Sequence, residues 1–95
     1  MLEQVHIKIT GTVQGVFYRA SAQEKAIELG ILGWIKNCND GSVEACIEGP
    51  LDKTTAFLAW AHTGPPRATV KNIEILKKLE IEAPQFDGFE IQLTH

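Results

Sequence analysis

The chain has 95 residues, 44% of them hydrophobic and 22% charged, and its formal net charge is −3. This length and composition are typical of one soluble globular domain, so we expect residues 1–95 to form a single domain and, at this size, a monomer. The negative charge argues against a nucleic-acid-binding protein, which neutralises phosphates with a surplus of cations. No apolar run approaches the roughly 20 residues that cross a bilayer, and the N-terminus lacks the pattern of a signal peptide. We therefore predict a cytoplasmic protein that binds neither membranes nor nucleic acid.

Alternating and helical hydrophobic patterns divide the chain into strands and helices. In chain order they predict a strand around residues 5–10, a helix over 19–30, a hairpin with arms at 31–37 and 42–48, a helix that begins at Pro50 or Asp52 and stops at Gly64-Pro65-Pro66, a long strand over 67–82 and a short strand over 88–93. This β-α-β-β-α-β order with one further strand is typical of the ferredoxin-like split βαβ sandwich. That is an α+β fold in which two helices cover one face of an antiparallel sheet.

The same patterns predict which side chains face the core. The expected inner residues of the two helices are Ala22, Ala26 and Leu29, with Ile27 beside them, and then Phe57, Leu58 and Ala61. In the long strand the alternation changes parity near Lys71-Asn72, which indicates a β-bulge there. In the short last strand the alternation places on one face Phe89, Ile91 and Leu93.

The cysteines and histidines form no metal or redox motif. Cys38 and Cys46 flank the predicted turn at Asp40-Gly41 without a Cys-x-x-Cys spacing, so we expect two free thiols rather than a disulfide. The three histidines are scattered along the chain, and no catalytic or metal-binding role is predicted for His6, His62 or His95. The sequence therefore predicts no metal and no cofactor.

Two further pairs of residues are expected to have structural rather than functional roles. Glu44 and Glu48 are expected to be exposed strand residues rather than an acid–base pair. Trp34 and Trp60 are expected to pack in or beside the core rather than to form a base-stacking surface. Neither pair is predicted to contribute to a site.

The stretch ITGTVQGVFYRA, residues 9–20, joins the first strand to the first helix. Free N–H groups and the helix dipole make the N-terminus of a helix a place that stabilises anions. Gly11 and Gly15 allow the backbone to turn so that successive N–H groups converge, and Arg19 in the first helical turn offers two parallel donors. A cation is mildly unfavourable at this end of the helix dipole. An arginine in that place therefore suggests that the site receives an anion. The alternative is a solvated arginine whose aliphatic part covers the helix edge.

Two separate segments together resemble a known family, the acylphosphatases. GTVQGVFYR, residues 11–19, resembles the family's first signature, Gly-x-Val-Gln-Gly-Val-x-aromatic-Arg. GWIKNCNDGSVEACIEG, residues 33–49, resembles the second, and GPPRATV, residues 64–70, is a weaker third element. The resemblance extends from Val5 to Phe89 and so covers nearly the whole chain.

The resemblance implies an enzyme that hydrolyses small acyl phosphates to a carboxylate and phosphate without metal or cofactor. Arg19 matches the arginine that binds the substrate phosphate, and Asn37 matches the asparagine that orients the attacking water. The backbone N–H groups that complete the phosphate site would come from Val13, Gln14, Gly15, Val16, Phe17 and Tyr18. From the residues alone, Asn37 also fits a turn residue at the end of a strand.

Three positions depart from the family pattern. Ile35 stands where Val or Ala is commoner, Tyr18 stands where Phe is commoner, and the C-terminus lacks the basic or aromatic residue often found after Phe-x-Ile. None of them is Arg19 or Asn37, so we expect them to affect rate and stability rather than abolish activity. The alternative function is a non-catalytic module of the same fold that binds phosphate or carbamoyl phosphate. An RNA-recognition module would need a basic, aromatic strand that this sequence does not have.

Overall fold

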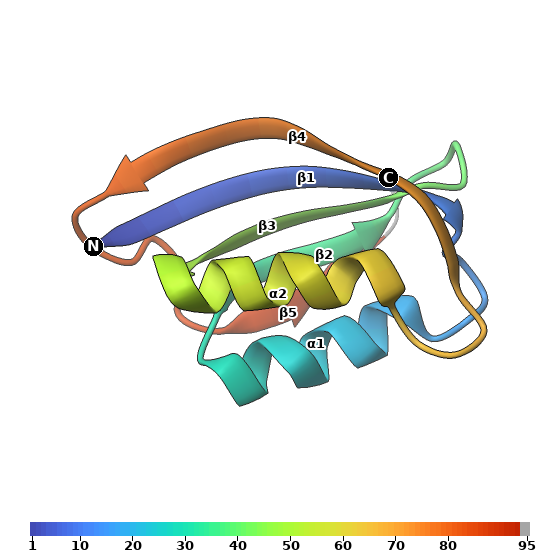
Figure 1. Ribbon diagram of the computed structural model, residues 1–95, viewed down its shortest axis with the longest axis horizontal. Helices are drawn as coiled ribbons and strands as arrows, with labels where there is room; N and C mark the ends of the chain where they lie inside the picture. Colours follow the sequence, from blue (N-terminus) through green and yellow to red (C-terminus); the bar gives the residue numbers. More distant parts are fainter. Residues whose placement is uncertain (94–95) are drawn as a thin grey trace.

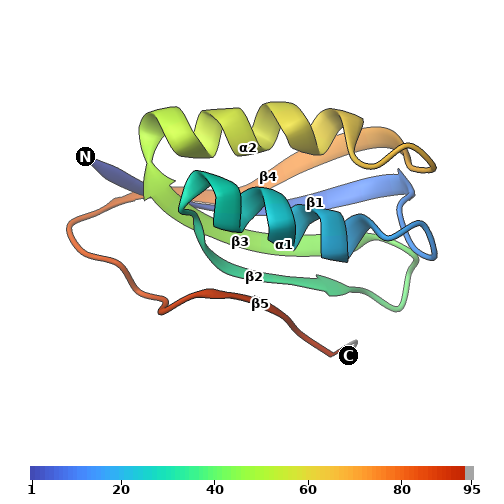
Figure 2. The same ribbon diagram turned by 90° about the horizontal axis from the view of Figure 1, so that it is seen from below.

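The structure, a computed structural model, describes residues 1–93 of the chain, so the prediction for His95 lies outside the described residues. Its elements are β1 (Leu2–Thr12), α1 (Tyr18–Leu29), β2 (Leu32–Asn37), β3 (Val43–Pro50), α2 (Leu51–Thr63), β4 (Thr69–Ile81) and β5 (Phe89–Ile91). The strands form one sheet in the order β4-β1-β3-β2-β5, and both helices lie on the same face of it (Figures 1 and 2). The predicted ferredoxin-like α+β fold is confirmed.

The central strands bring the predicted apolar positions together under the helices. β1 and β3 are antiparallel, and their inward residues face each other as Val5 with Ile47, Ile7 with Ala45 and Ile9 with Val43. All six side chains are buried. Alternation along the strand therefore produces the floor of the core, since successive side chains point to opposite faces of a sheet.

The last strand departs from the expected antiparallel sheet. β4, β1, β3 and β2 pair antiparallel, but β5 pairs parallel with β2, so the sheet is mixed. The connection from β4 to β5 crosses from one edge of the sheet to the other, which sets this direction. Of the three residues that were expected to share a buried face, Phe89 is buried, whereas Ile91 is 38% and Leu93 81% exposed.

β4 contains the predicted bulge and a second one. Thr10 pairs with Asn72 while Gly11 pairs with Val70, which leaves Lys71 as the extra residue, as predicted. A second shift between His6 and Ile7 leaves Leu76 unpaired in the same way, and the sequence pattern did not indicate it. At Gly11, which has a φ of 131°, a Cβ would lie 2.1 Å from the carbonyl oxygen of Thr69. Glycine at this position therefore allows β4 to approach β1, rather than shaping the loop that follows.

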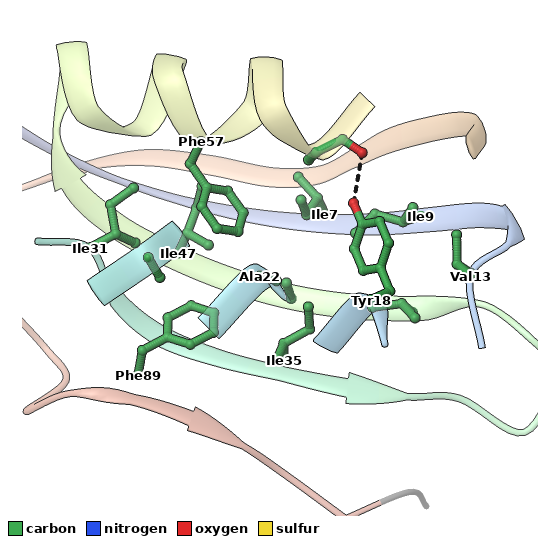
Figure 3. Close-up of a cluster of buried hydrophobic side chains, with 14 of the residues drawn as sticks. Ile7, Ile9, Val13, Tyr18, Ala22, Ile31, Ile35, Ile47, Phe57 and Phe89 are labelled. Carbon is green, nitrogen blue, oxygen red and sulfur yellow. Dashed lines mark hydrogen bonds between the residues drawn. The ribbon is translucent and has the colours of Figure 1, made fainter. Parts of the chain in front are cut away.

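The helices bury narrower stripes than the sequence pattern suggested. The buried residues of α1 and α2 are Tyr18, Ala22, Ala26, Thr54, Phe57 and Ala61. Leu29, Leu58 and Trp60 are partly buried against this core, but Ile27 is 67% exposed and does not belong to it. The rings of Phe57 and Phe89 approach to 6.2 Å between centroids and join α2 to β5 across the sheet (Figure 3).

The expectation of two exposed glutamates on β3 is wrong for Glu48. Its side chain is 1% exposed and accepts hydrogen bonds from the Gln4 side chain and from the backbone N–H groups of Gln85 and Phe86. The β4–β5 connection therefore covers Glu48 on the face of the sheet that does not carry the helices. Glu44 is partly buried, with Oε1 at 2.8 Å from Nε2 of His6.

The two cysteines are free thiols, as predicted. Cys46 is buried on the face of the sheet away from the helices, beside Trp34 on the neighbouring strand. Burial, followed by the charge of Glu48, raises the pKa of the Cys46 thiol to about 11. Cys46 therefore stays protonated at neutral pH and behaves as a small apolar side chain.

Candidate active site

The β1–α1 loop and the β2–β3 turn lie at the same end of the molecule. β1 and β2 both pair antiparallel with β3, so their carboxyl ends point the same way. In both ribbon views the loop, in light blue, and the turn, in pale green, extend beyond the strands at this end (Figures 1 and 2). The topology thus brings together two motifs that are separated by about 20 residues in the sequence.

The loop before α1 has a backbone suited to anion binding. We call residues 13–18 the anion loop. Gly15 has a φ of 76° and Phe17 a φ of 64°, while Val16 between them has a negative φ. Left-handed residues in a loop can turn neighbouring N–H groups into one concavity. The left-handed backbone of Phe17 costs about 1–2 kcal/mol of conformational energy. Backbone strain of this kind is typical of functional sites.

The first turn of α1 has no anionic side chain of its own. Phe17 is the N-cap residue and makes no side-chain cap, and no acidic residue lies in the first turn. The partial positive charge of the helix N-terminus is therefore not neutralised by a carboxylate from this turn. Arg19 adds a full positive charge at the same place. An anion bound there would be stabilised by both.

One cavity joins the anion loop to the end of β2. Its volume is about 390 Å³, and its lining residues are Val13, Gly15, Phe17, Tyr18, Arg19, Ala20, Asn37 and Ile91. Arg19 and Asn37, which belong to different sequence motifs, therefore line the same space. The volume is within the range of small-molecule sites.

Asn37 faces this cavity because of its place on β2. Ile35 points into the core under α1, and side chains two residues apart share one face of a strand, so Asn37 points the same way. Its Oδ1 atom is buried and has no hydrogen-bond partner among residues 1–93. A buried acceptor without a partner is rare in native structures.

The side chains of Gln14 and Val16 do not line the cavity. Val16 is 9% exposed and packs in the core. Nε2 of Gln14 donates to the backbone oxygens of Cys38 and Ser42, both at 2.8 Å, and so joins the anion loop to the β2–β3 turn. Of these two residues, only the backbone N–H groups are available to the predicted anion site.

The two unusual neighbours of the site are both core residues. Ile35 is 1% exposed and does not line the cavity. Tyr18 is 2% exposed, and its hydroxyl donates to the carbonyl oxygen of Ala61 in α2 at 2.7 Å (Figure 3). Burial raises the pKa of the Tyr18 phenol well above its usual range, so it stays a neutral donor. Neither residue therefore adds a polar group to the cavity.

Ala20 and Ile91 line the cavity although neither belongs to the residues predicted for the site. Ala20 follows Arg19 directly, so helical continuity could have suggested it. Ile91 belongs to β5, whose parallel pairing with β2 carries it next to Ile35. No local pattern indicates that pairing, because it depends on how the connection after β4 crosses the sheet.

Other features of residues 1–93 offer weaker sites. A groove of about 360 Å³ between α1 and the α2–β4 connection contains Glu24 and Glu28, and Lys25 there is paired with Glu28 at 2.7 Å. No three His, Cys, Asp or Glu side chains of the described chain gather where a metal ion could bind. None of the helices in this part of the chain is long and apolar enough to cross a membrane.

Together, the elements and the cavity define a small α+β domain with a cavity between a helix N-terminus and a strand end. The family model described as acylphosphatase matches residues 5–91. The chain is 51% identical over 81 residues to the acylphosphatase of Azoarcus sp. (strain BH72), a match that covers 85% of this chain and 83% of the relative. The chain belongs to the acylphosphatase family.

Solved structures agree with this assignment. The acylphosphatase from Bacillus subtilis superimposes with a TM-score of 0.87 at 32% identity, covering 97% of this chain and 99% of that one. The acylphosphatase from Coxiella burnetii superimposes with a TM-score of 0.84 at 35% identity, covering 96% and 93%. The similarity therefore includes the whole arrangement of strands and helices.

Proposed function

We propose that this chain is an acylphosphatase that hydrolyses the carboxyl–phosphate bond of acyl phosphates at the cavity lined by Arg19 and Asn37. The observation on which the site assignment rests is that one cavity is lined by a cation, Arg19, by the left-handed residues of the loop before α1, and by Asn37, whose amide oxygen has no partner among residues 1–93. These are the parts needed to hold a phosphoryl group and a water molecule next to it.

In this reaction a water oxygen forms a bond to phosphorus while the bond between phosphorus and the carboxyl oxygen breaks. The bonding pair leaves with the carboxylate, and both protons of the water remain on the phosphate produced. A carboxylate is stable without a proton at neutral pH, so the leaving group needs no general acid. The demand on the enzyme is therefore for positioning and for stabilisation of charge on the phosphoryl oxygens.

The proposed roles follow from this demand. Arg19 holds two phosphoryl oxygens through its planar donors, and the N–H groups of the anion loop hold the remaining charge. The side-chain amide of Asn37 holds the attacking water by accepting or donating a hydrogen bond and so orients it. An amide is too weak a base to take the proton, so we infer that a phosphoryl oxygen of the substrate receives it.

A non-catalytic phosphate-binding module is the alternative, and no observation favours it. Such a module would need the anion loop and Arg19 but would have no use for the buried oxygen of Asn37. We also propose that the protein acts as a cytoplasmic monomer without metal. Size-exclusion chromatography, and assays with and without a chelator, test the oligomeric state and the metal requirement.

The test measures hydrolysis of benzoyl phosphate by the wild type and by two pairs of variants. Arg19→Ala and Asn37→Ala should each lower kcat/KM by about 100-fold or more, the typical effect of removing one stabilising or positioning group. The matched controls are Arg67→Ala and Asn39→Ala, since both residues are exposed and lie outside the cavity. We expect near-wild-type rates from the controls.

Binding of inorganic phosphate separates the two functions. A wild type that binds phosphate but does not turn over benzoyl phosphate would support the module. If Arg19→Ala had an unchanged kcat/KM, the assignment of the active site to this cavity would be wrong, even though the wild type hydrolyses acyl phosphates.

A further inference from the structure

Glu44 lies behind Asn37, on the face of the sheet that does not carry the helices. Successive side chains of a strand point to opposite faces, so the two neighbours of Asn37 in the chain point away from the cavity. Both neighbours contact one atom, Oε2 of Glu44 on β3. Nζ of Lys36 lies 3.9 Å from this atom, and the thiol of Cys38 donates to it at 3.7 Å. One carboxylate therefore holds the chain on each side of the residue that is proposed to orient water.

The carboxylate of Glu44 is itself held by β1 and by an aromatic ring. Its Oε1 lies 2.8 Å from the buried Nε2 of His6, close enough for an ion pair but not aligned for a hydrogen bond. The His6 ring meets the Trp34 ring edge to face at 5.4 Å between centroids, and Nζ of Lys36 lies 5.5 Å from the centre of the same ring. The side chains of Glu44 and Lys36 are each 22% exposed, so solvent screens their attraction less than that of a fully exposed pair.

Asn37 needs such a support because it is the last residue of β2. The ladder with β3 stops at its pair with Val43, and the turn begins directly after it. Its side-chain oxygen has no hydrogen-bond partner among residues 1–93, so no hydrogen bond of that atom fixes the amide. A misplacement of about 1 Å of a positioned group can cost about 100-fold in rate. The backbone at Asn37 is therefore a place where a restraint from outside the cavity affects the reaction.

Glu44 has no direct route to the reacting atoms. It does not line the cavity and points to the opposite face of the sheet from Asn37, so it neither contacts the phosphoryl group nor transfers a proton to it. Arg19 and the anion loop belong to the connection between β1 and α1, so removal of the Glu44 carboxylate should leave the phosphate site in place. The two halves of the site should therefore respond differently to this change.

We infer that Glu44 is a positioning residue of this enzyme, which holds the end of β2 through Lys36 and Cys38 so that Asn37 orients the attacking water. The inference rests on the proposed function and adds to it a residue from the opposite face of the sheet. It predicts that loss of Glu44 lowers kcat without weakening phosphate binding, and that this loss depends on the presence of Asn37.

The test compares Glu44→Ala and Glu44→Gln with the wild type. Glu44→Ala should lower kcat for benzoyl phosphate by about 10–100-fold, the effect of a small misplacement of a positioned group. Glu44→Gln keeps the size of the side chain and one acceptor oxygen, so it should lower kcat less. The inhibition constant of inorganic phosphate should change by less than about twofold in both variants, because Arg19 and the anion loop remain.

A double-mutant cycle shows whether Glu44 acts through Asn37. In an Asn37→Ala background, Glu44→Ala should have almost no further effect on kcat, since residues that act through one another are not additive. A second measurement needs no turnover. The side-chain NH₂ resonances of Asn37 in a proton–nitrogen correlation spectrum should shift in Glu44→Gln.

Glu3→Gln is the matched control. Glu3 is a 5% exposed carboxylate near the start of β1, the end of this strand away from the cavity. It accepts a hydrogen bond from the hydroxyl of Thr54 at 2.5 Å and lies 3.7 Å from Nζ of Lys78. Its replacement should lower the urea midpoint without lowering kcat or shifting the Asn37 resonances.

The outcomes separate this inference from the proposed function. An unchanged kcat in the folded Glu44 variants, or an equal loss of kcat in the wild-type and Asn37→Ala backgrounds, would overturn the positioning role and leave the enzyme assignment standing. Unmoved Asn37 resonances in Glu44→Gln, or a phosphate inhibition constant that rises as much as kcat falls, would do the same. Absence of hydrolysis by the folded wild type would overturn the proposed function and this inference with it.

Discussion

At the scale of single residues, Gln14 connects the two halves of the site without lining it. Its side chain makes two hydrogen bonds of 2.8 Å to the β2–β3 turn, one of them to Cys38, the residue after Asn37. These bonds fix the distance between the anion loop and the amide that is proposed to orient water. We therefore regard Gln14 as a positioning residue.

Gln14→Ala should lower kcat by about 10–100-fold, because small misplacements of a positioned group have effects of this size. KM should rise less than kcat falls, since Arg19 and the helix N-terminus remain. Loss of the two bonds should also lower the free energy of unfolding by about 1–2 kcal/mol. Steady-state kinetics and urea denaturation measure the two effects.

Gln4→Ala is the matched control for this prediction. It removes a partly buried side-chain hydrogen bond, from Gln4 to Glu48 at 3.0 Å, far from the cavity. It should lower stability without lowering kcat. If both variants lose stability but neither loses kcat, Gln14 supports only the fold.

At the scale of elements, the β2–β3 turn is held by one carboxylate. Oδ2 of Asp40 lies 2.8 Å from Nζ of Lys8 on β1, and Oδ1 accepts hydrogen bonds from the hydroxyl and the backbone N–H of Ser42, at 2.5 and 3.0 Å. The hydrogen bond from Lys8, followed by those from Ser42, holds the pKa of Asp40 well below its usual range. The same contact raises the pKa of Lys8.

A carboxylate whose folded pKa is lowered stabilises the fold above its unfolded pKa, which is about 3.9 for aspartate. The stabilisation is lost as the pH falls through the lower, folded value. Between pH 5 and 7, Asp40→Asn should therefore unfold at a lower urea concentration than the wild type. Below about pH 4 the difference between the two urea midpoints should shrink steadily. The effect is small because this pair is exposed.

Asp87→Asn serves as the control, since Asp87 is exposed and has no ion pair among the described contacts. A difference between wild type and Asp40→Asn that stays constant down to pH 2.5 would contradict the assigned cause.

The elements also show which sequence signals were sufficient. Gly30 and Gly64 mark the ends of α1 and α2 because each adopts a positive φ there, which glycine accepts without strain. The bulge at Lys71 was visible because it reverses the parity of the apolar residues on β4. The bulge at Leu76 was not, since the exposed apolar residues around it, Ile75 and Leu76, leave no alternation to interrupt.

At the scale of the whole molecule, two features that the sequence patterns did not indicate depend on the path of the chain after β4. This connection turns Glu48 from an expected surface residue into a buried acceptor, and it places Ile91 beside the end of β2. By contrast, Arg19 and Asn37 could be selected through the resemblance of their motifs to the acylphosphatases, whereas from the residues alone each kept a plain structural alternative. The structure places both on one cavity. Non-local contacts with no local pattern are the part that could not be predicted.

The buried carboxylate of Glu48 is expected to determine how firmly the connection and β5 are held. Its Oε2 accepts from the N–H groups of Gln85 at 2.6 Å and Phe86 at 3.0 Å. Hydrogen bonds to a charged group are stronger than neutral ones, and donors left without a partner add a further cost. Glu48→Ala should therefore lower the free energy of unfolding by about 2–3 kcal/mol, and Glu48→Gln, which keeps one acceptor oxygen, should lower it less.

Amide hydrogen exchange gives the sharper measurement, because it reports the connection itself. In Glu48→Ala the N–H groups of Gln85 and Phe86 should exchange faster relative to the amides of β1, an interior strand of the sheet that pairs on both sides. Glu74→Ala is the matched control, an exposed glutamate on β4 that should change neither stability nor exchange. If the two variants behave alike, the connection is held by Phe89 in the core rather than by Glu48. If they differ, one buried carboxylate holds the segment that brings Ile91 to the cavity.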